Sequence, residues 1–159
     1  AQFSKPVVAA VAGLAIGIGT TVLLHCDLVY AADSARFQLP FTQLGLCPEA
    51  GSSVLLPNLA GYQRAAQYLL LGEAFGATEA LQMGLVNQVV TNTEVAALAL
   101  EKAVKLAALP ADAVQSSKAL LKRNTQPLTL ETIATELVQF QRLLNTDESQ
   151  QRISAFFKR

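Results

Sequence analysis

Residues 5–20 have the sequence KPVVAAVAGLAIGIGT, in which an apolar run leads into closely spaced glycines. Residues 6–11 are continuously apolar and rich in β-branched valine, which predicts a strand that is covered on both faces, as in a parallel sheet. Gly17 and Gly19 then allow the backbone to turn sharply. Residues 20–26 are apolar and predict a short helix. The stretch therefore indicates a strand–turn–helix unit of an α/β fold.

The same stretch raises the alternative of a membrane segment. No charged residue occurs from residue 6 to residue 24, which is about the length of a membrane-spanning helix. Lys5 before an apolar run also resembles the start of a signal peptide. Three glycines at positions 13, 17 and 19, after a β-branched run, nevertheless favour strand–turn–helix over one continuous helix. We expect no membrane partner.

Length and composition narrow the class of protein. A chain of 159 residues predicts one domain with a sizeable core. Hydrophobic residues make up 52% and charged residues 15%, which excludes a disordered chain and leaves apolar surface that oligomerisation could cover. The 12 basic residues are dispersed and balance 12 acidic ones, so no nucleic-acid partner is expected. Cys26 and Cys47 are too few for a metal knuckle, and reduced thiols in a cytoplasmic protein are expected.

The pattern of elements changes near residue 92. Before it, strands and short helices alternate, and after it the sequence predicts long helices. Further strands are expected at 27–31, 35–38 and 85–90, and helices at 51–57, 61–71, 78–83, 93–108, 111–123, 130–144 and 148–157. We therefore divide the chain into an α/β part, residues 1–92, and a helical part, residues 93–159.

Ile18 lies between two glycines at the expected junction of strand and helix. Amides at such a junction are unpaired and suit an anionic oxygen. The enolate of a thioester is such an oxygen, and a hole of this kind is typically worth about 3 kcal/mol. The alternative is that Gly17 and Gly19 only permit tight packing of the strand against the helix. Spacing alone favours this packing explanation.

Glu49 is the second candidate, in the stretch LGLCPEAGSS of residues 44–53. No basic residue occurs from residue 37 to residue 63. Burial without a cation disfavours the charged form of a carboxylate and raises its affinity for a proton, which is what a general acid or base needs. The alternative is that Glu49 caps the amides of the helix that begins after it. The residues alone leave both explanations open.

Other polar residues are weaker candidates. His25, the chain's single histidine, lies on the apolar helix expected at 20–26. A hydrogen-bonded histidine of the core is favoured there over a catalyst. Lys118, Lys122 and Arg123 could contact a phosphate, but a solvated helix face is the default expectation.

Taken together, several segments resemble the enoyl-CoA hydratase/isomerase family, also called the crotonase family. In order, they are KPVVAAVAG from residue 5, GIG from 17, CDLVYA from 26, FQLP from 37, LGL from 44 and GLV from 84. The resemblance covers nearly the whole chain. It implies the C-terminal portion of a crotonase-like ββα spiral, followed by a helical trimerisation region. It also implies acyl-CoA thioester chemistry in fatty acid metabolism.

The resemblance assigns roles to individual residues. It implies that the Ile18 amide supplies one oxyanion-hole donor, and that Gly17, Gly19 and Phe41 lie against the substrate. Hydratases of the family carry two glutamates, one two residues after the glycine pair and one after the later proline. Thr21 and Phe41 occupy those positions here, which disfavours the addition of water.

The stretch PEAGSS from residue 48 resembles instead the delta-3, delta-2 enoyl-CoA isomerase branch of the family. A single glutamate shuttles the proton in that branch. The resemblance therefore implies that Glu49 moves a proton from the alpha carbon of a 3-enoyl-CoA to its gamma carbon. The alternatives are a hydratase or another acyl-CoA reaction of the same fold, and a non-catalytic crotonase-like assembly subunit.

The resemblance also implies partners. The coenzyme A thioester is the substrate, no metal or redox cofactor is expected, and the assembly is a homotrimer or hexamer in the cytoplasm. Family members have a further N-terminal part, which carries the first spiral turns and the second oxyanion-hole amide. We expect these to come from a preceding segment or from a separate N-terminal chain.

Overall fold

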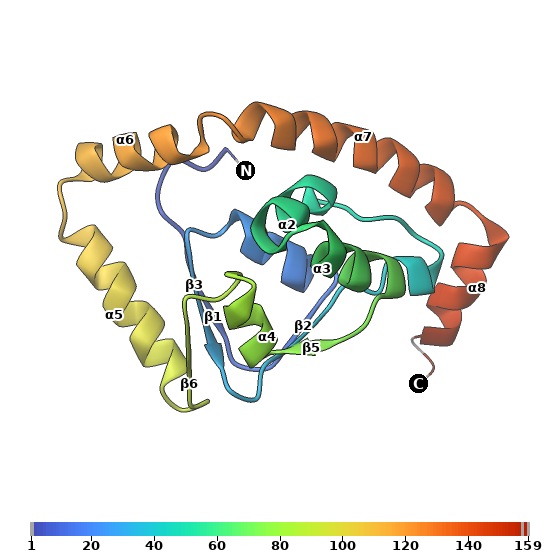
Figure 1. Ribbon diagram of the computed structural model, residues 1–159, viewed down its shortest axis with the longest axis horizontal. Coiled ribbons are helices and arrows are strands. Elements are labelled where there is room, and N and C mark those ends of the chain that lie inside the picture. Colours follow the sequence, from blue (N-terminus) through green and yellow to red (C-terminus); the bar gives the residue numbers. More distant parts are fainter. Residues whose placement is uncertain (1, 157, 159) are drawn as a thin grey trace.

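The computed structural model describes residues 2–156 and 158, and Figure 1 shows how its elements are arranged. Within this part of the chain the strands form two small sheets. One sheet is parallel throughout, in the order β1 (Val8–Val11), β3 (Leu28–Ala32), β6 (Gln88–Val90). The other has the order β2 (Leu14–Ile16), β4 (Arg36–Gln38), β5 (Phe75–Gly76), with β2 parallel and β5 antiparallel to β4.

The chain passes from the first sheet to the second twice, and each time a helical segment follows. β1 leads into β2 and then into α1 (Ile18–Thr21) and the 3₁₀ turn η1 (Val22–His25). β3 leads into β4 and then into the 3₁₀ turn η2 (Thr42–Leu44) and α2 (Ser52–Ala60). This ββα repeat agrees with the spiral that the resemblance implies.

Two short strands, β2 and β5, are absent from the sequence-based expectation. Residues 5–20 predict one strand before the glycine turn, whereas the structure has two, with β2 pairing along β4. Only Ala15 of β2 is buried, while Leu14 and Ile16 are exposed. A strand of three residues is too short to display an alternating pattern in the sequence. The two-residue β5 is missing from the expectation for the same reason.

Of the helices expected at 51–57 and 61–71, the first continues past its expected end and the second changes from α-helical to π-helical. α2 continues through Pro57 to Ala60, although the proline predicts an end there. Leu56 is buried at this point, and the Pro57 carbonyl still accepts a hydrogen bond from the Gly61 amide at 3.0 Å. The next segment begins as α3 (Tyr62–Ala66) and ends as the π-helical turn η3 (Gln67–Leu71). α4 (Ala77–Gln82) follows β5.

Four long helices form the helical part: α5 (Val95–Ala107), α6 (Ala111–Lys122), α7 (Gln126–Leu144) and α8 (Asp147–Phe156). α7 begins four residues before the expected start because Pro127 lies in its first turn, where a missing N–H group costs no helical hydrogen bond. Phe157, expected at the end of the last helix, lies outside the described residues.

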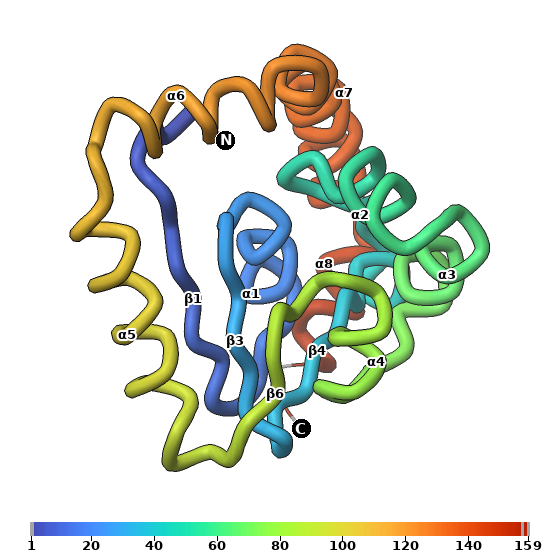
Figure 2. The backbone as a smooth tube through the Cα atoms, turned by 60° about the vertical axis from the view of Figure 1, so that its left-hand side comes forward, coloured from blue at the N-terminus to red at the C-terminus, as the bar shows by residue number. Residues whose placement is uncertain are grey.

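The helical part bends around the α/β part, as Figures 1 and 2 show. α5 lies along β1 and β3, α7 passes over α2, and α8 contacts η2. Val95 and Ala99 of α5 pack on Tyr30 and Ala32 of β3. The main core lies on the other side of the first sheet and includes Phe37, which stacks on Phe75.

The uncharged run from residue 6 to residue 24 forms β1, β2 and helical turns rather than one helix. Among the described residues, we find no helix with the length and apolar character needed to cross a membrane.

Candidate functional site

A cavity of about 650 Å³ lies where the turn between β2 and α1, the segment after β4, and the helices α7 and α8 meet. Its walls are almost entirely apolar. Among the described residues that line it, Glu49 is the one ionisable side chain. The lining residues are Ile16, Gly17, Ile18, Pro40, Phe41, Leu44, Leu46, Glu49, Ala50, Ile133, Leu137, Phe140 and Phe156.

The structure therefore brings together four of the five residues that the sequence singles out. Gly17, Ile18, Phe41 and Glu49 all line this cavity. Gly19 does not line it and lies inside α1. The contact between Gly19 and a substrate stays a prediction.

Gly17 makes the turn that presents Ile18 to the cavity. Its φ of 56° and ψ of −119° are a backbone conformation that L side chains rarely adopt. The Gly17 amide donates to the Gln38 carbonyl at 2.9 Å, and its own carbonyl accepts from the amides of Thr20 and Thr21. Ile18 is the first residue of α1, so its amide has no acceptor one turn earlier in the helix. This N–H group is the candidate donor to an anionic oxygen.

Glu49 is half-buried and is held by a threonine. The Thr21 hydroxyl donates to Glu49 Oε1 at 2.5 Å, and Thr21 itself is fully buried. Thr21 is three residues after Ile18 in α1, so one short helix carries both the candidate amide and the partner of the carboxylate. In the sequence, Thr21 stands out only because hydratases of the resembled family have a glutamate at this position. Its role as a donor to Glu49 is a finding of the structure.

The turn that follows Glu49 is unusual in its backbone. Ala50 has a φ of 57° and Gly51 a φ of 76°, so two successive residues are left-handed. His25 Nε2 lies 2.6 Å from the Ala50 carbonyl. A carbonyl can only accept, so Nε2 carries the proton in this contact.

Glu49 does not cap the helix that begins after it, which was the alternative explanation for its position. The amides of Gly51 and Ser53 donate instead to the carboxylate of Glu136, at 2.6 and 2.9 Å. Glu136 comes from α7 and is 7% exposed. Nothing in the local sequence marks it, because its partners lie 85 and 83 residues away. Glu49 is left to line the cavity.

His25 is hydrogen-bonded, as the sequence favours, but it is half-buried and belongs to neither core cluster. Burial lowers its pKa below the ordinary value, and the charge of Lys122 acts in the same direction, while the hydrogen bond to Ala50 opposes them. Its side chain stabilises the turn after Glu49, because it is hydrogen-bonded to the Ala50 carbonyl.

Lys118 departs from the expectation of a solvated helix face. It is 8% exposed, and its ammonium group lies 2.7 Å from Asp27 Oδ2 and 2.6 Å from the Lys5 carbonyl. Lys122 donates to the His25 carbonyl at 3.1 Å. Arg123 is exposed, as expected.

Cys26 and Cys47 are free thiols, and burial raises the pKa of both. In the part of the chain that the structure describes, no three His, Cys, Asp or Glu side chains are grouped so that they could hold a metal ion.

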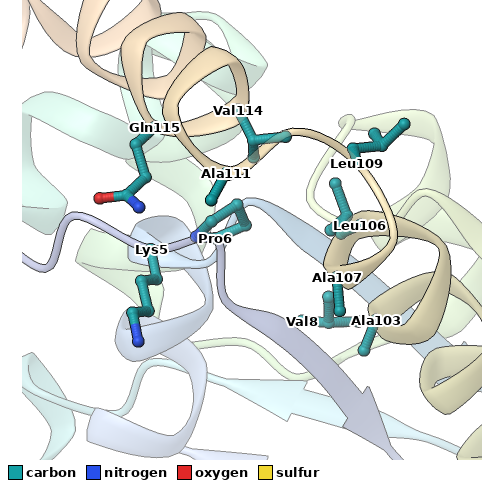
Figure 3. Close-up of a pocket in the computed structure, with 10 residues that line it drawn as sticks. All are labelled: Lys5, Pro6, Val8, Ala103, Leu106, Ala107, Leu109, Ala111, Val114 and Gln115. Atoms are coloured by element: carbon teal, nitrogen blue, oxygen red, sulfur yellow. The ribbon is translucent and has the colours of Figure 1, made fainter.

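A second cavity, of about 310 Å³, lies at the start of β1 between α5 and α6. Figure 3 shows Pro6 and Val8 facing Leu106 and Ala107 of α5, with Val114 and Gln115 of α6 above them. Lys5 and Gln115 are its polar lining residues. None of the residues that line it is a carboxylate or a histidine, so it offers no general base, unlike the cavity that contains Glu49.

Comparison with known proteins identifies the family. The sequence profile described as "Enoyl-CoA hydratase/isomerase" matches residues 1–159. The chain is 36% identical to 2,3-dehydroadipyl-CoA hydratase of Escherichia coli over 157 residues, which cover 99% of the chain and 62% of that protein. It is 40% identical to enoyl-CoA delta isomerase 2 of Rattus norvegicus over 123 residues, which cover 77% of the chain and 32% of that protein.

Solved structures agree. OdaA of Pseudomonas aeruginosa superposes with a TM-score of 0.96 at 42% identity, covering 99% of the chain and 64% of OdaA. An enoyl-CoA hydratase/isomerase of Pseudoalteromonas atlantica superposes with a TM-score of 0.95 at 41% identity, covering 99% and 63%. The chain spans less than two thirds of the length of each of these four proteins. The crotonase-like α/β fold with a helical C-terminal region is confirmed, and the chain belongs to the enoyl-CoA hydratase/isomerase family.

Proposed function

We propose that the protein containing this chain converts 3-enoyl-CoA thioesters into 2-enoyl-CoA thioesters, with Glu49 as the single proton shuttle. One observation supports this above the others: Glu49 is the one ionisable side chain among the described residues that line the apolar cavity. A shift of a double bond needs one base, whereas the addition of water calls for groups that activate and orient the water.

The proposed reaction conserves every atom of the substrate. Glu49 takes a proton from the alpha carbon, and the electron pair of that C–H bond delocalises into the thioester carbonyl to give a dienolate. The Ile18 amide stabilises the dienolate oxygen, an interaction that is typically worth about 3 kcal/mol. Glu49 then returns the proton to the gamma carbon, which leaves the double bond between the alpha and beta carbons.

The surroundings of Glu49 support this reaction over hydration. The positions at which the resemblance places the two glutamates of a hydratase are Thr21 and Phe41. Thr21 donates to Glu49, and Phe41 adds an apolar wall to the cavity. Neither side chain is a base that could activate water. Relatives named as isomerases and as hydratases are both similar to this chain, so hydration is the second candidate.

Glu49→Gln in the full-length protein tests the proposal. The amide cannot accept the alpha proton, so we expect kcat for 3-enoyl-CoA isomerisation to fall by about 10³-fold. Formation of the conjugated 2-enoyl thioester can be followed by its ultraviolet absorbance. Glu73→Gln, at an exposed glutamate outside the cavity, is the matched control and should retain wild-type turnover.

A hydration assay with 2-enoyl-CoA separates the alternatives. Near-normal isomerisation by Glu49→Gln would refute the proton shuttle. Wild-type hydration faster than isomerisation would favour the hydratase. Binding of acyl-CoA with neither reaction would favour a non-catalytic assembly subunit.

The proposal includes a homotrimer or hexamer in the cytoplasm, with an acyl-CoA substrate and no metal. Large apolar side chains stay exposed along the helical part, which supports assembly with other copies. Examples are Leu100, Val104, Leu120, Leu121 and Val138, each at least 59% exposed.

A further inference from the structure

Glu136 is a buried carboxylate that the proposed reaction does not use. It lies on α7, and its neighbours Ile133 and Leu137 on that helix line the cavity. Its side chain faces the start of α2, where Oε2 accepts from the Gly51 amide at 2.6 Å and Oε1 from the Ser53 amide at 2.9 Å. Both oxygens of one carboxylate are therefore committed to one turn of backbone.

These two amides need a partner from outside their own helix. The first amides of an α-helix have no acceptor one turn earlier, and Gly51, the N-cap residue of α2, has no side chain that could cap them. Gly51 is buried, so water cannot replace the partner of its amide without rearrangement, whereas Ser53 is exposed. Glu136 supplies the missing acceptors across 85 residues of sequence.

The turn that Glu136 holds is the one that carries Glu49. Ala50 and Gly51 are both left-handed, a conformation that persists in a non-glycine residue only where the surroundings enforce it. His25 holds the Ala50 carbonyl from one side at 2.6 Å, and Glu136 holds the next amide from the other. The peptide group between Ala50 and Gly51 is thus held at both its carbonyl and its N–H.

We propose that Glu136 is a positioning residue, which fixes the turn at residues 49–53 so that the Glu49 carboxylate stays against both Thr21 and the cavity. This inference rests on the proposed role of Glu49 as the base. Glu136 touches no reacting atom. It acts through the backbone, and it makes the position of the base depend on a helix of the C-terminal part.

The test compares Glu136→Gln with Glu131→Gln in the full-length protein. Glutamine keeps the size of the side chain but offers one acceptor, and its NH₂ group would face an amide donor. We expect kcat for 3-enoyl-CoA isomerisation to fall by about 10²-fold, as small misplacements of a catalytic group do, with KM within about twofold of wild type. Glu131 is an exposed glutamate of the same helix, so Glu131→Gln should match wild type.

A cap with no influence on the base would weaken the fold without changing kcat well below the unfolding temperature. Wild-type kcat in folded Glu136→Gln would therefore overturn the inference. Glu136→Asp keeps the charge and both oxygens but is one methylene shorter, and we expect an intermediate loss of about 10-fold at unchanged KM. If the glutamine variant does not fold, wild-type kcat in Glu136→Asp overturns the inference instead.

A second readout does not depend on the reaction. The ¹³C resonance of the Glu49 carboxyl group, assigned by its disappearance in Glu49→Gln, should move in Glu136→Gln and stay in place in Glu131→Gln. A moved resonance in a protein without isomerase activity would refute the proposed function and leave the positioning role intact. A resonance that stays in place in Glu136→Gln would refute the positioning role, whatever the reaction is.

Discussion

The Thr21 hydroxyl is hydrogen-bonded to one of the two carboxylate oxygens of Glu49, the proposed base. It donates to Glu49 Oε1 at 2.5 Å from a fully buried position. Because that oxygen is engaged, we expect Oε2 to be the atom that accepts the alpha proton in the proposed reaction. The hydroxyl also fixes the rotation of the carboxyl group, since the donor sits on a helix and cannot follow a moving side chain.

Thr21→Val removes this donor at nearly constant volume. We expect kcat for isomerisation to fall by about 10-fold, because a carboxylate oxygen loses its fixed partner and the base reorients. Thr21→Ser keeps the hydroxyl and should stay within about threefold of wild type by the same reasoning. Steady-state kinetics on 3-enoyl-CoA measure both. Equal rates for the valine and serine variants would show that the hydroxyl does not orient Glu49.

The sequence predicts candidate site residues whose neighbours along the chain are distinctive. It misses residues whose partners are distant in the sequence. Glu49 stands out because its neighbours are apolar, and Ile18 because glycines flank it. Glu136 has the appearance of an ordinary polar position on an amphipathic helix. Its partners are 85 and 83 residues away, so its role depends on how α7 packs over α2.

At the start of α2, the backbone conformation and the packing of α7 both restrict position 51 to glycine. Gly51 has a φ of 76°, and a Cβ atom there would lie 3.1 Å from Thr129 Cγ2 and 3.4 Å from Ile133 Cγ1 of α7. The turn thus requires glycine for its conformation and also for the close approach of α7.

Gly51→Ala should lower the free energy of unfolding by about 2 kcal/mol, because left-handed strain and crowding against α7 add together. Urea unfolding of the full-length protein measures the loss. Gly84→Ala is the matched control, since Gly84 has a φ of 82° but its Cβ would meet only Leu59 Cδ1 at 3.5 Å. We expect about 1 kcal/mol there from strain alone. An equal loss of unfolding free energy in the two variants would mean that α7 shifts to accommodate the added methyl group without destabilising the fold.

Elements with a long periodic pattern are the ones that the sequence predicts well. The four helices of the C-terminal part all occur, and their limits lie close to the expected ones except at the start of α7, which is four residues earlier. β2 and β5 have three and two residues and exist because β4 lies between them. Such strands are products of tertiary pairing, and no local pattern could reveal them.

At the scale of the whole molecule, Asp27 joins the helical part to the α/β part. It precedes β3, and its Oδ2 accepts from the Lys118 ammonium at 2.7 Å and from the Val7 amide at 2.7 Å. Lys122 adds a longer ion pair to Oδ1 at 3.6 Å. One carboxylate thus connects α6 with the entrance to β1 and the start of β3.

Partial burial raises the pKa of Asp27, but the hydrogen bonds from Lys118 and Val7 and the charges of both lysines outweigh it and hold this pKa below the ordinary value. A pKa that is depressed in the folded state contributes stability at pH values above the unfolded pKa of about 3.9. That contribution is lost as the pH falls through the folded value. The helical part should therefore be held less firmly to the α/β part in acid.

Asp27→Asn tests this connection. At pH 7 the variant should lose about 2 kcal/mol of unfolding free energy, because the ion pairs with Lys118 and Lys122 are lost and the Lys118 ammonium is left with only a neutral acceptor, in a pair that solvent partly reaches. Measured by urea unfolding of the full-length protein between pH 7 and pH 3, the difference from wild type should shrink below about pH 4, where the wild-type carboxyl group also becomes neutral. Asp33→Asn, at an exposed aspartate just after β3, should show no such difference at any pH. A difference for Asp27→Asn that persists unchanged at pH 3 would mean that the shape of the side chain, rather than its charge, holds α6 to the sheet.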